Sequence, residues 1–246
     1  MTARPAPGWL TQWEFAHRGL HGPGANGLVP ENSIAAAKGA IARGMGIECD
    51  IQRSRDDHPI VFHDWDLARL TGATGLAQER EAEALEALHL LGTDQHPVRL
   101  ARFLEIVAGR VPLLIEIKSL PGYDVERTCA SVSWLLDSYK HDVAVMSFDP
   151  RVPKWFAAEA PGITRGLVGT DSLENGFEGV WRAPDAVAAA EPDFLAIDVR
   201  DLHRPEAAAW RTGGQPLLTW TVRSPETRLT GLALADALIA EGAGLA

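Results

Sequence analysis

The chain has 246 residues, of which 46% are hydrophobic and 23% are charged, so it can form one sizeable core without a second domain. Its net charge is -10 with only 23 Lys and Arg, which excludes the broad basic face that a nucleic-acid partner requires. The two cysteines, Cys49 and Cys129, are far apart and lack CxxC spacing, which predicts reduced structural thiols and neither a disulfide framework nor a zinc site.

The first residues form an N-terminal segment, 1–13, that precedes the first predicted strand. This region contains two prolines and no apolar stretch of the length found in secretory signals. No later run approaches the roughly 18 apolar residues of a membrane span. We therefore expect a cytoplasmic protein without integral membrane association.

Short β-like runs alternate with helix-like runs through residues 14–246, without a low-complexity linker. This alternation predicts repeated βα units, a parallel sheet and a single domain. The nine predicted strands span 14–19, 46–52, 59–64, 111–118, 143–149, 163–168, 194–198, 216–222 and 235–241. An eight-stranded barrel has one fewer.

A hairpin accounts for the extra strand. Residues 54–59, SRDDHP, are too few for the crossover helix that joins parallel strands, but they suit a tight turn. Folding the chain back about Asp57 is expected to place His63 opposite Ile51 and beside Asp50.

A helix is predicted over residues 33–43, SIAAAKGAIAR, between the first two strands. Asn32 or Ser33 can cap its start, and Gly44 follows its end. In α/β barrels, residues at the carboxyl ends of strands form the active site. This rule selects His17, Arg18, Glu48, Asp50, Glu116, Lys118, Asp149, Asp198 and Trp220.

Carboxylates at these strand ends indicate a metal site. Glu48 and Asp50 are two positions apart and share one strand face, whereas Cys49 points to the helix layer. Glu116 adds a third carboxylate from a buried strand, with Lys118 on the same face. Three oxygen ligands favour Mg²⁺ or Ca²⁺ over zinc. The alternative is that Glu116 and Lys118 form only a buried ion pair.

Two histidines at strand ends indicate acid–base chemistry. His17 and Arg18 precede Gly19, which permits close approach of the backbone to a ligand, and the Arg18 side chain suits a phosphate. A single histidine at a strand end is commonly structural, but His17 and His63 beside carboxylates and cations match the two proton transfers of phosphodiester cleavage.

The remaining histidines lie in loops or polar stretches and are expected to be solvated. They are His21, His58, His89, His96, His141 and His203. Among them, His21 is the one candidate for a place near the site, because it follows His17 by four residues. Trp220 can stack on an organic group or simply belong to the core.

Together, these motifs resemble the glycerophosphodiester phosphodiesterase family. They are HRG (17–19), PENS (30–33), the ExD of residues 48–50, VFHD (61–64), EIK (116–118) and TWTV (219–222). They occur in the family's order and cover most of the chain, which makes chance agreement much less probable than for one short motif.

The resemblance implies a (β/α)8 TIM barrel of the phospholipase-C-like phosphodiesterase type. It implies that Glu48, Asp50 and Glu116 bind one divalent metal ion, and that His17 and His63 act as acid and base, with His17 favoured as the acid. It also implies that the substrate-binding residues are Arg18, Glu31, Lys118 and Trp220.

Three departures from the family pattern leave every expected metal ligand and catalytic histidine in place, and two of them, the longer loop and Arg223, bear on substrate identity. Residues 20–29 lengthen the link between HRG and PENS, residues 54–58 replace the common Asp-Gly turn, and Arg223 follows TWTV where Asn is usual. The longer loop and Arg223 are both expected near the barrel mouth. Residues 65–110 are too few for the insertion domain that some relatives carry.

The predicted function is metal-dependent hydrolysis of a small glycerophosphodiester to an alcohol and glycerol 3-phosphate. One alternative is a phospholipase-D-like lyase that releases a cyclic phosphate from a lysophospholipid. Another is a barrel that binds a phosphorylated metabolite without catalysis. The sequence leaves open the leaving alcohol, the choice between Mg²⁺ and Ca²⁺, the nucleophile and the oligomeric state.

Overall fold

The barrel consists of parallel strands that close on themselves. The computed structural model describes residues 5–25, 27–172 and 176–246. Strand β1 pairs with both the last strand and β4, which closes the sheet and confirms the predicted eight-stranded barrel. In this described part of the chain the barrel strands are β1 (Phe15–Ala16), β4 (Gly46–Arg53), β7 (Leu113–Ile117), β8 (Val143–Ser147), β9 (Thr164–Gly169), β10 (Phe194–Asp198), β11 (Leu217–Val222) and β12 (Ala237–Ala240).

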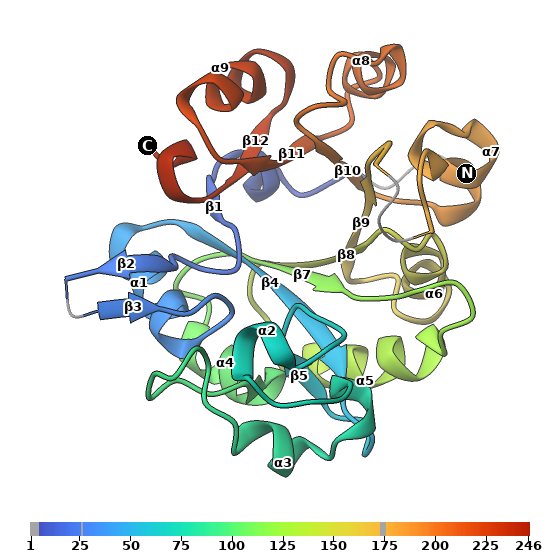
Figure 1. The fold of residues 1–246 in the computed structure, drawn as a ribbon. Coiled ribbons are helices and arrows are strands. Elements are labelled where there is room, and N and C mark those ends of the chain that lie inside the picture. Colours follow the sequence, from blue (N-terminus) through green and yellow to red (C-terminus); the bar gives the residue numbers. More distant parts are fainter. Residues whose placement is uncertain (1–4, 26, 173–175) are drawn as a thin grey trace.

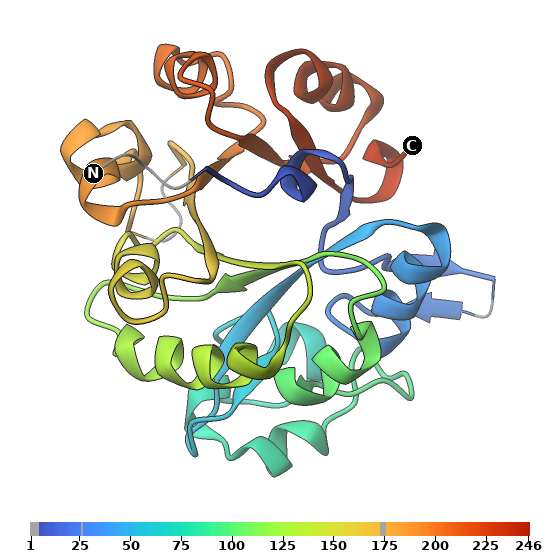
Figure 2. The ribbon, with the colours of Figure 1, turned by 180° about the vertical axis from the view of Figure 1, so that it is seen from behind.

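Helices surround the barrel, as the two opposite views in Figures 1 and 2 show. Each crossover between successive barrel strands contributes at least one helix to this outer layer, as expected for parallel neighbours. The main helices are α1 (Ile34–Arg43), α4 (Leu100–Val107), α5 (Val125–Ser138), α6 (Arg151–Glu159), α7 (Pro184–Ala190), α8 (Pro205–Thr212) and α9 (Pro225–Leu234).

Two apolar layers hold the barrel together. One lies between strands and helices and includes Cys49, whose side chain faces the helices as predicted. The other fills the barrel interior near the amino ends of the strands, where Phe15 and Phe194 are completely buried. Leu10, from the 3-10 helix Gly8–Thr11, packs into this interior layer. Apolar side chains thus occupy one end of the barrel and leave the other for polar groups.

Helix α1 fixes the HRG segment, residues 17–19, in place. Ser33, one of the two predicted caps, accepts a hydrogen bond from the Ala36 amide (3.1 Å) and begins the helix. Gly19 has φ +75°, and a Cβ there would lie 2.8 Å from the Ala36 Cβ. The close approach of the HRG segment to α1 therefore requires glycine at position 19.

The predicted hairpin is present, but its register differs from the prediction. Strand β5 (Pro59–Val61) runs antiparallel to β4 and pairs Val61, not His63, with Ile51. The turn is shorter than a fold about Asp57 implies, because Ser54 and His58 are already hydrogen bonded and Asp57 adopts a left-handed conformation with φ +66°. His63 lies two residues beyond the end of β5, past Phe62, whose amide donates to the Asp50 carbonyl.

Several short strands and helices lie outside the barrel itself. Residues within the lengthened 20–29 link form an antiparallel hairpin of β2 (Gly22–Gly24) and β3 (Gly27–Val29). Strand β6 (Val98–Arg99) extends the sheet beyond β5. Helices α2 (Ala68–Thr71) and α3 (Ala82–Glu86) cover a small apolar cluster around Phe62 and do not form a separate domain. In the described ranges, no helix combines the length and apolar character needed to cross a membrane.

Candidate active site

The candidate site is a cavity of about 700 Å³ at the carboxyl ends of the strands. Six of the residues predicted to act in catalysis, substrate binding or metal binding line it together, although they come from strands far apart in the chain. They are His17, Arg18, His63, Glu116, Lys118 and Trp220. Glu48 and Asp50 lie beneath these residues, each 1% exposed.

Three carboxylates form the floor of the cavity. Glu48, Asp50 and Glu116 each place an oxygen within 4.8 Å of the others, and all three are buried. The register explains the convergence, because Asp50 of β4 pairs directly with Glu116 of β7 and both side chains point into the barrel. The predicted metal-binding residues are therefore brought together by the fold.

The charges in this cluster are unevenly compensated. Burial opposes ionisation of Asp50, but Lys118, His63 and Arg18 outweigh it and hold the pKa of Asp50 well below its ordinary value. Burial, followed by repulsion from Asp50 and Glu116, raises the pKa of Glu48 well above its ordinary value. Glu48 is thus the carboxylate that lacks a sufficient counter-charge.

The donor set fits a hard divalent cation. Glu48 Oε2 accepts a hydrogen bond from the Arg18 amide (2.9 Å), but the buried Oε1 has no hydrogen-bond partner among the described residues. Lys118 Nζ lies 2.8 Å from Asp50 Oδ1 and 2.6 Å from Glu116 Oε1, so it compensates two of the three carboxylates. Oxygen ligands and an unpaired buried carboxylate oxygen are the features that Mg²⁺ or Ca²⁺ satisfies.

Asn32 holds the central carboxylate in position. Its Nδ2 donates to Asp50 Oδ2 (2.8 Å), and its Oδ1 accepts from the Asp50 amide (3.1 Å). Asn32 adopts φ +56°, a conformation that asparagine tolerates better than most residues. Of the two cap candidates, Ser33 caps the helix, and Asn32 instead binds Asp50.

Arg18 extends over the carboxylates from the end of β1. Its Nη1 donates to Glu31 Oε1 (2.6 Å), and its Nε lies 3.4 Å from Asp50 Oδ2. Glu31 in turn binds Arg69 through both carboxylate oxygens (2.8 and 2.9 Å). Hydrogen bonds from two arginines that line the cavity, Arg18 and Arg69, therefore connect Glu31 to the site.

His17 is held by a carboxylate from the last strand. Its Nδ1 lies 2.5 Å from Oε2 of Glu241, a residue 224 positions later in the chain. Because an ionised carboxylate accepts hydrogen bonds, Nδ1 carries the proton and the neutral ring leaves Nε2 without one. Nε2 lies 4.0 Å from Glu48 Oε2. Burial lowers the pKa of His17, and the bond to Glu241 offsets this only in part.

His63 has a carboxylate partner of its own. Its Nδ1 lies 2.6 Å from Asp64 Oδ1. Arg69 donates to both oxygens of Asp64, from Nε (2.6 Å) and Nη2 (2.8 Å). Burial opposes the ionisation of Asp64, but the bonds from His63 and Arg69 hold its pKa well below the ordinary value. Arg69 thus connects the partner of His63 with Glu31, the partner of Arg18.

Trp220 forms an apolar wall of the cavity. Its indole N–H donates to the Ala196 carbonyl (2.9 Å), and its ring meets Phe148 edge-on at 5.2 Å. The ring packs on the interior layer and also lines the cavity, and its stacking on an organic group stays a prediction.

Among the other histidines, four are exposed as expected: His58, His89, His141 and His203. His96 is half-buried and binds the Leu88 carbonyl. His21 does reach the site region, because its Nε2 lies 3.2 Å from Glu241 Oε2. The strand-end residues Asp149 and Asp198 bind Arg151 and Arg200 and do not join the carboxylate cluster.

Several contacts of the site were missed from the sequence. Glu241 and Asp64 orient the two histidines, and Arg69 joins Asp64 to Glu31. Glu241 closes the predicted strand 235–241, so the strand-end rule could have selected it. Asp64 directly follows His63, whereas no sequence pattern marked Arg69.

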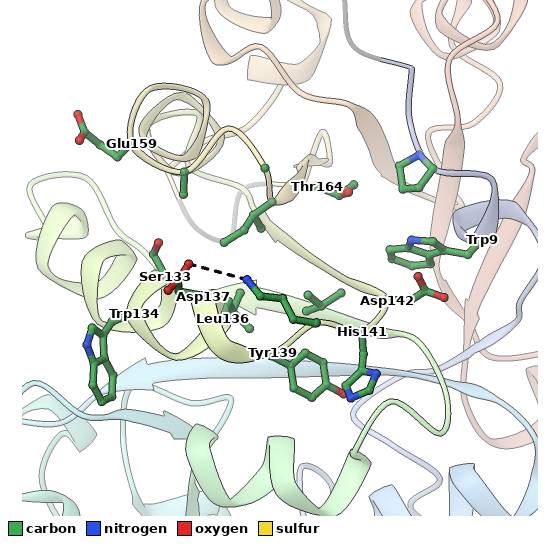
Figure 3. Close-up of a pocket in the computed structure, with 16 residues that line it drawn as sticks. Trp9, Ser133, Trp134, Leu136, Asp137, Tyr139, His141, Asp142, Glu159 and Thr164 are labelled. Atoms are coloured by element: carbon green, nitrogen blue, oxygen red, sulfur yellow. Dashed lines mark ion pairs between the residues drawn. The ribbon is translucent and has the colours of Figure 1, made fainter.

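A second cavity, of about 580 Å³, lies at the opposite end of the barrel (Figure 3). It adjoins Val143 and Thr164, the first residues of β8 and β9, and is also lined by Trp9, Tyr139 and His141. None of the predicted site residues lines it.

Comparison with known proteins identifies the family. Residues 17–242 match the model of the Glycerophosphoryl diester phosphodiesterase family. The chain belongs to this family. The match begins at His17 of the HRG segment and extends to the residue after Glu241.

Individual relatives agree with this assignment. The chain is 36% identical to a glycerophosphodiester phosphodiesterase of Caldanaerobacter subterraneus over 110 residues, which are 44% of this chain and 40% of that protein. This alignment therefore covers less than half of the relative's length. Over 226 residues, 87% of each protein, the chain is 26% identical to YhdW of Bacillus subtilis.

Solved structures share the barrel. An Oleispira antarctica phosphodiesterase, determined in complex with the product sn-glycerol-3-phosphate, superimposes with a TM-score of 0.77 at 22% identity and covers 96% of this chain and 93% of its own. A Thermotoga maritima glycerophosphodiester phosphodiesterase gives 0.72 at 23% identity, with 92% of each chain covered. At these identities the likeness concerns the fold.

Proposed function

We propose that this protein hydrolyses a glycerophosphodiester to an alcohol and glycerol 3-phosphate, with a divalent cation at Glu48, Asp50 and Glu116. The observation that carries the proposal is the composition of one cavity. Two histidines, each paired with a carboxylate, and two cations surround a buried three-carboxylate cluster. Family membership and the product bound to the Oleispira antarctica relative support the same chemistry.

Arg18 and Lys118 would bind the phosphate. Arg18 is fixed by Glu31, so its remaining donors can be aimed at phosphate oxygens with little loss of side-chain freedom. Lys118 contacts both Asp50 and Glu116 and offsets part of their negative charge, which would otherwise repel the phosphate and the developing negative charge of the transition state. Trp220 would provide an apolar surface for the carbon atoms of the substrate.

His17 and His63 would move the two protons. We assign His17 as the acid that protonates the leaving alcohol, and His63 as the base that deprotonates water or the glycerol 2-hydroxyl. Glu241 accepts a hydrogen bond from Nδ1 and would stabilise the doubly protonated ring of His17, whose Nε2 would then donate its proton to the leaving alcohol. Asp64 orients His63 in the same way.

A bound Mg²⁺ or Ca²⁺ would polarise a non-bridging phosphate oxygen and lower the barrier to attack at phosphorus. The unpaired Glu48 Oε1 and the neighbouring oxygens of Asp50 and Glu116 are the atoms that would hold it.

The first test is turnover. Purified protein is incubated with glycerophosphocholine and glycerophosphoethanolamine in the presence of Mg²⁺, Ca²⁺ or EDTA, and glycerol 3-phosphate is measured enzymatically. Release that requires a metal supports the proposal. A cyclic phosphate as the final product, seen by phosphorus NMR, would point instead to the lyase reaction, and absence of turnover on every diester tested would favour a binding barrel.

Replacing His17 or His63 by alanine should lower kcat by about 10² to 10⁴. Circular dichroism and thermal unfolding check that each variant still folds. His203 is exposed and does not line the cavity, so His203→Ala is the matched control that should keep full activity. Near-normal rates in both His17 and His63 variants would contradict this assignment.

Location and boundaries remain predictions. Cys49 and Cys129 are free and buried, which agrees with a reducing compartment. We propose a cytoplasmic location on this basis, and a catalytic domain spanning residues 14–246 after the short segment 1–13.

A further inference from the structure

Arg223 lies at the mouth of the active-site cavity, directly after β11. Its side chain is 59% exposed. The backbone amide of Arg223 donates to Thr227 Oγ1 at the start of α9, which fixes the point from which the side chain emerges. The catalytic scheme above does not use this residue.

One side of the Arg223 guanidinium is anchored next to the catalytic histidine. Its Nε lies 2.5 Å from Glu241 Oε1, while Glu241 Oε2 binds His17 Nδ1. A single carboxylate therefore joins Arg223 to His17. If His17 protonates the leaving alcohol, Arg223 lies on the side of the cavity that this alcohol occupies.

The other side of the guanidinium is available. Neither Nη1 nor Nη2 of Arg223 has a hydrogen-bond or ion-pair partner among the residues that the structure describes. The other exposed arginines of this cavity differ, because Arg69 uses all three nitrogens on Glu31 and Asp64, and Arg200 places Nε and Nη2 on Asp198. Two parallel N–H donors in one plane match the two oxygens of a carboxylate.

We propose that Arg223 is a specificity residue that binds a carboxylate carried by the leaving alcohol. The preferred substrates are then glycerophosphodiesters whose alcohol bears an acidic group, as in glycerophosphoserine. This inference rests on the proposed function and on His17 as the acid. Because Nε is already held by Glu241, little side-chain freedom is lost when the terminal nitrogens bind the substrate.

The competing explanation is that Arg223 only compensates the charge of Glu241. In that case its loss would disturb His17 and slow every substrate by the same factor. Recognition of a carboxylate instead affects one substrate and not its neutral counterpart, so the ratio between two matched substrates separates the explanations.

Glycerophosphoserine and glycerophosphoethanolamine form such a pair, since they differ only in the carboxylate. We measure kcat/KM for both with the wild-type protein, Arg223→Gln and Arg223→Lys, at saturating metal. The wild type should prefer glycerophosphoserine by about ten-fold or more, the scale of a hydrogen bond to a charged group. Arg223→Gln should bring the ratio to about one, mainly by raising KM for glycerophosphoserine, and Arg223→Lys should retain part of the preference.

Arg200→Gln is the matched control, because it removes one positive charge from the same cavity wall and should leave the ratio unchanged. The proposal is overturned if the wild type shows no preference, if Arg223→Gln slows both substrates equally, or if Arg200→Gln lowers the ratio as much as Arg223→Gln does. Absence of turnover with both substrates would overturn the proposed hydrolysis itself, and this inference with it.

Discussion

Replacing Glu48 by glutamine should stabilise the metal-free protein and remove the stabilisation that a divalent cation provides. Glu48 is 1% exposed, and one of its oxygens has no hydrogen-bond partner among the described residues. Glutamine keeps the shape of the side chain and can still accept from the Arg18 amide. It removes the buried charge that Asp50 and Glu116 repel.

The two effects can be given magnitudes. An unsatisfied buried polar atom costs about 1 to 3 kcal/mol, and more if it is charged. For a chain of this size about 1 kcal/mol corresponds to 2 to 4 °C, so metal-free Glu48→Gln should unfold roughly 2 to 12 °C higher than the wild type. A cation at a hundred times its Kd adds about 2.7 kcal/mol, or roughly 5 to 11 °C, to the wild type.

The first effect depends on pH in a defined direction. Burial raises the pKa of Glu48, so the group destabilises the folded state only where it is ionised. The stability that protonated Glu48 contributes to the folded state is fully present below the ordinary glutamate pKa, and it is lost as the pH rises through the raised pKa. The advantage of Glu48→Gln should therefore grow with pH and vanish in acid.

Thermal unfolding followed by circular dichroism, from pH 4 to pH 8, measures both effects in EDTA and in increasing Mg²⁺ or Ca²⁺. Asp193→Asn is the control, because Asp193 is also a buried carboxylate but binds the Arg165 amide (3.1 Å) away from the cluster. Asp193→Asn should lower the unfolding temperature of the metal-free protein and leave the rise in unfolding temperature on metal addition unchanged. A metal-free Glu48→Gln that is less stable than the wild type, yet gains the same shift from metal, would refute this account of the site.

Three further substitutions test the scaffold around the site. Asn32→Ala removes both hydrogen bonds to Asp50 and should weaken metal binding by about 10- to 100-fold, read from the midpoint of a metal titration; an unchanged midpoint would count against it. Gly166→Ala places a Cβ 2.3 Å from the Phe194 ring and should cost about 1 to 3 kcal/mol in chemical denaturation, whereas wild-type stability would mean that the ring can move. Ser33→Ala removes the cap of α1 and should cost about 0.5 to 2 kcal/mol by the same measurement, an effect that Ser33→Asp should largely avoid.

The barrel could be predicted because local patterns and global topology agree. Apolar runs at βα spacing permit few arrangements, and the short 54–59 segment indicates the hairpin in place of a ninth barrel strand. The carboxylate cluster could be predicted from alternation, which places Glu48 and Asp50 on one face, and from the strand-end rule, which selects Glu116 on the strand that pairs with theirs. These features depend on periodicity, which a sequence displays directly.

Register and side-chain partners depend on information that periodicity lacks. The pairing of His63 was misplaced by two residues, because the turn is centred on Asp56 and not on Asp57. A shift of two residues keeps each side chain on the same face of the hairpin, however, so His63 still lines the cavity. Arg69 was not predicted because its role arises from the position of α2, which depends on how a small apolar cluster packs beneath it.

The 224 positions between His17 and Glu241 bear on how the protein gains activity during synthesis. These residues meet only where the last strand docks against the first, at the seam that closes the barrel. A nascent chain synthesised as far as β7 already contains the three carboxylates and His63, but its His17 still lacks Glu241, the group that orients it. Competence for proton transfer should consequently emerge in one late event, when the seam closes.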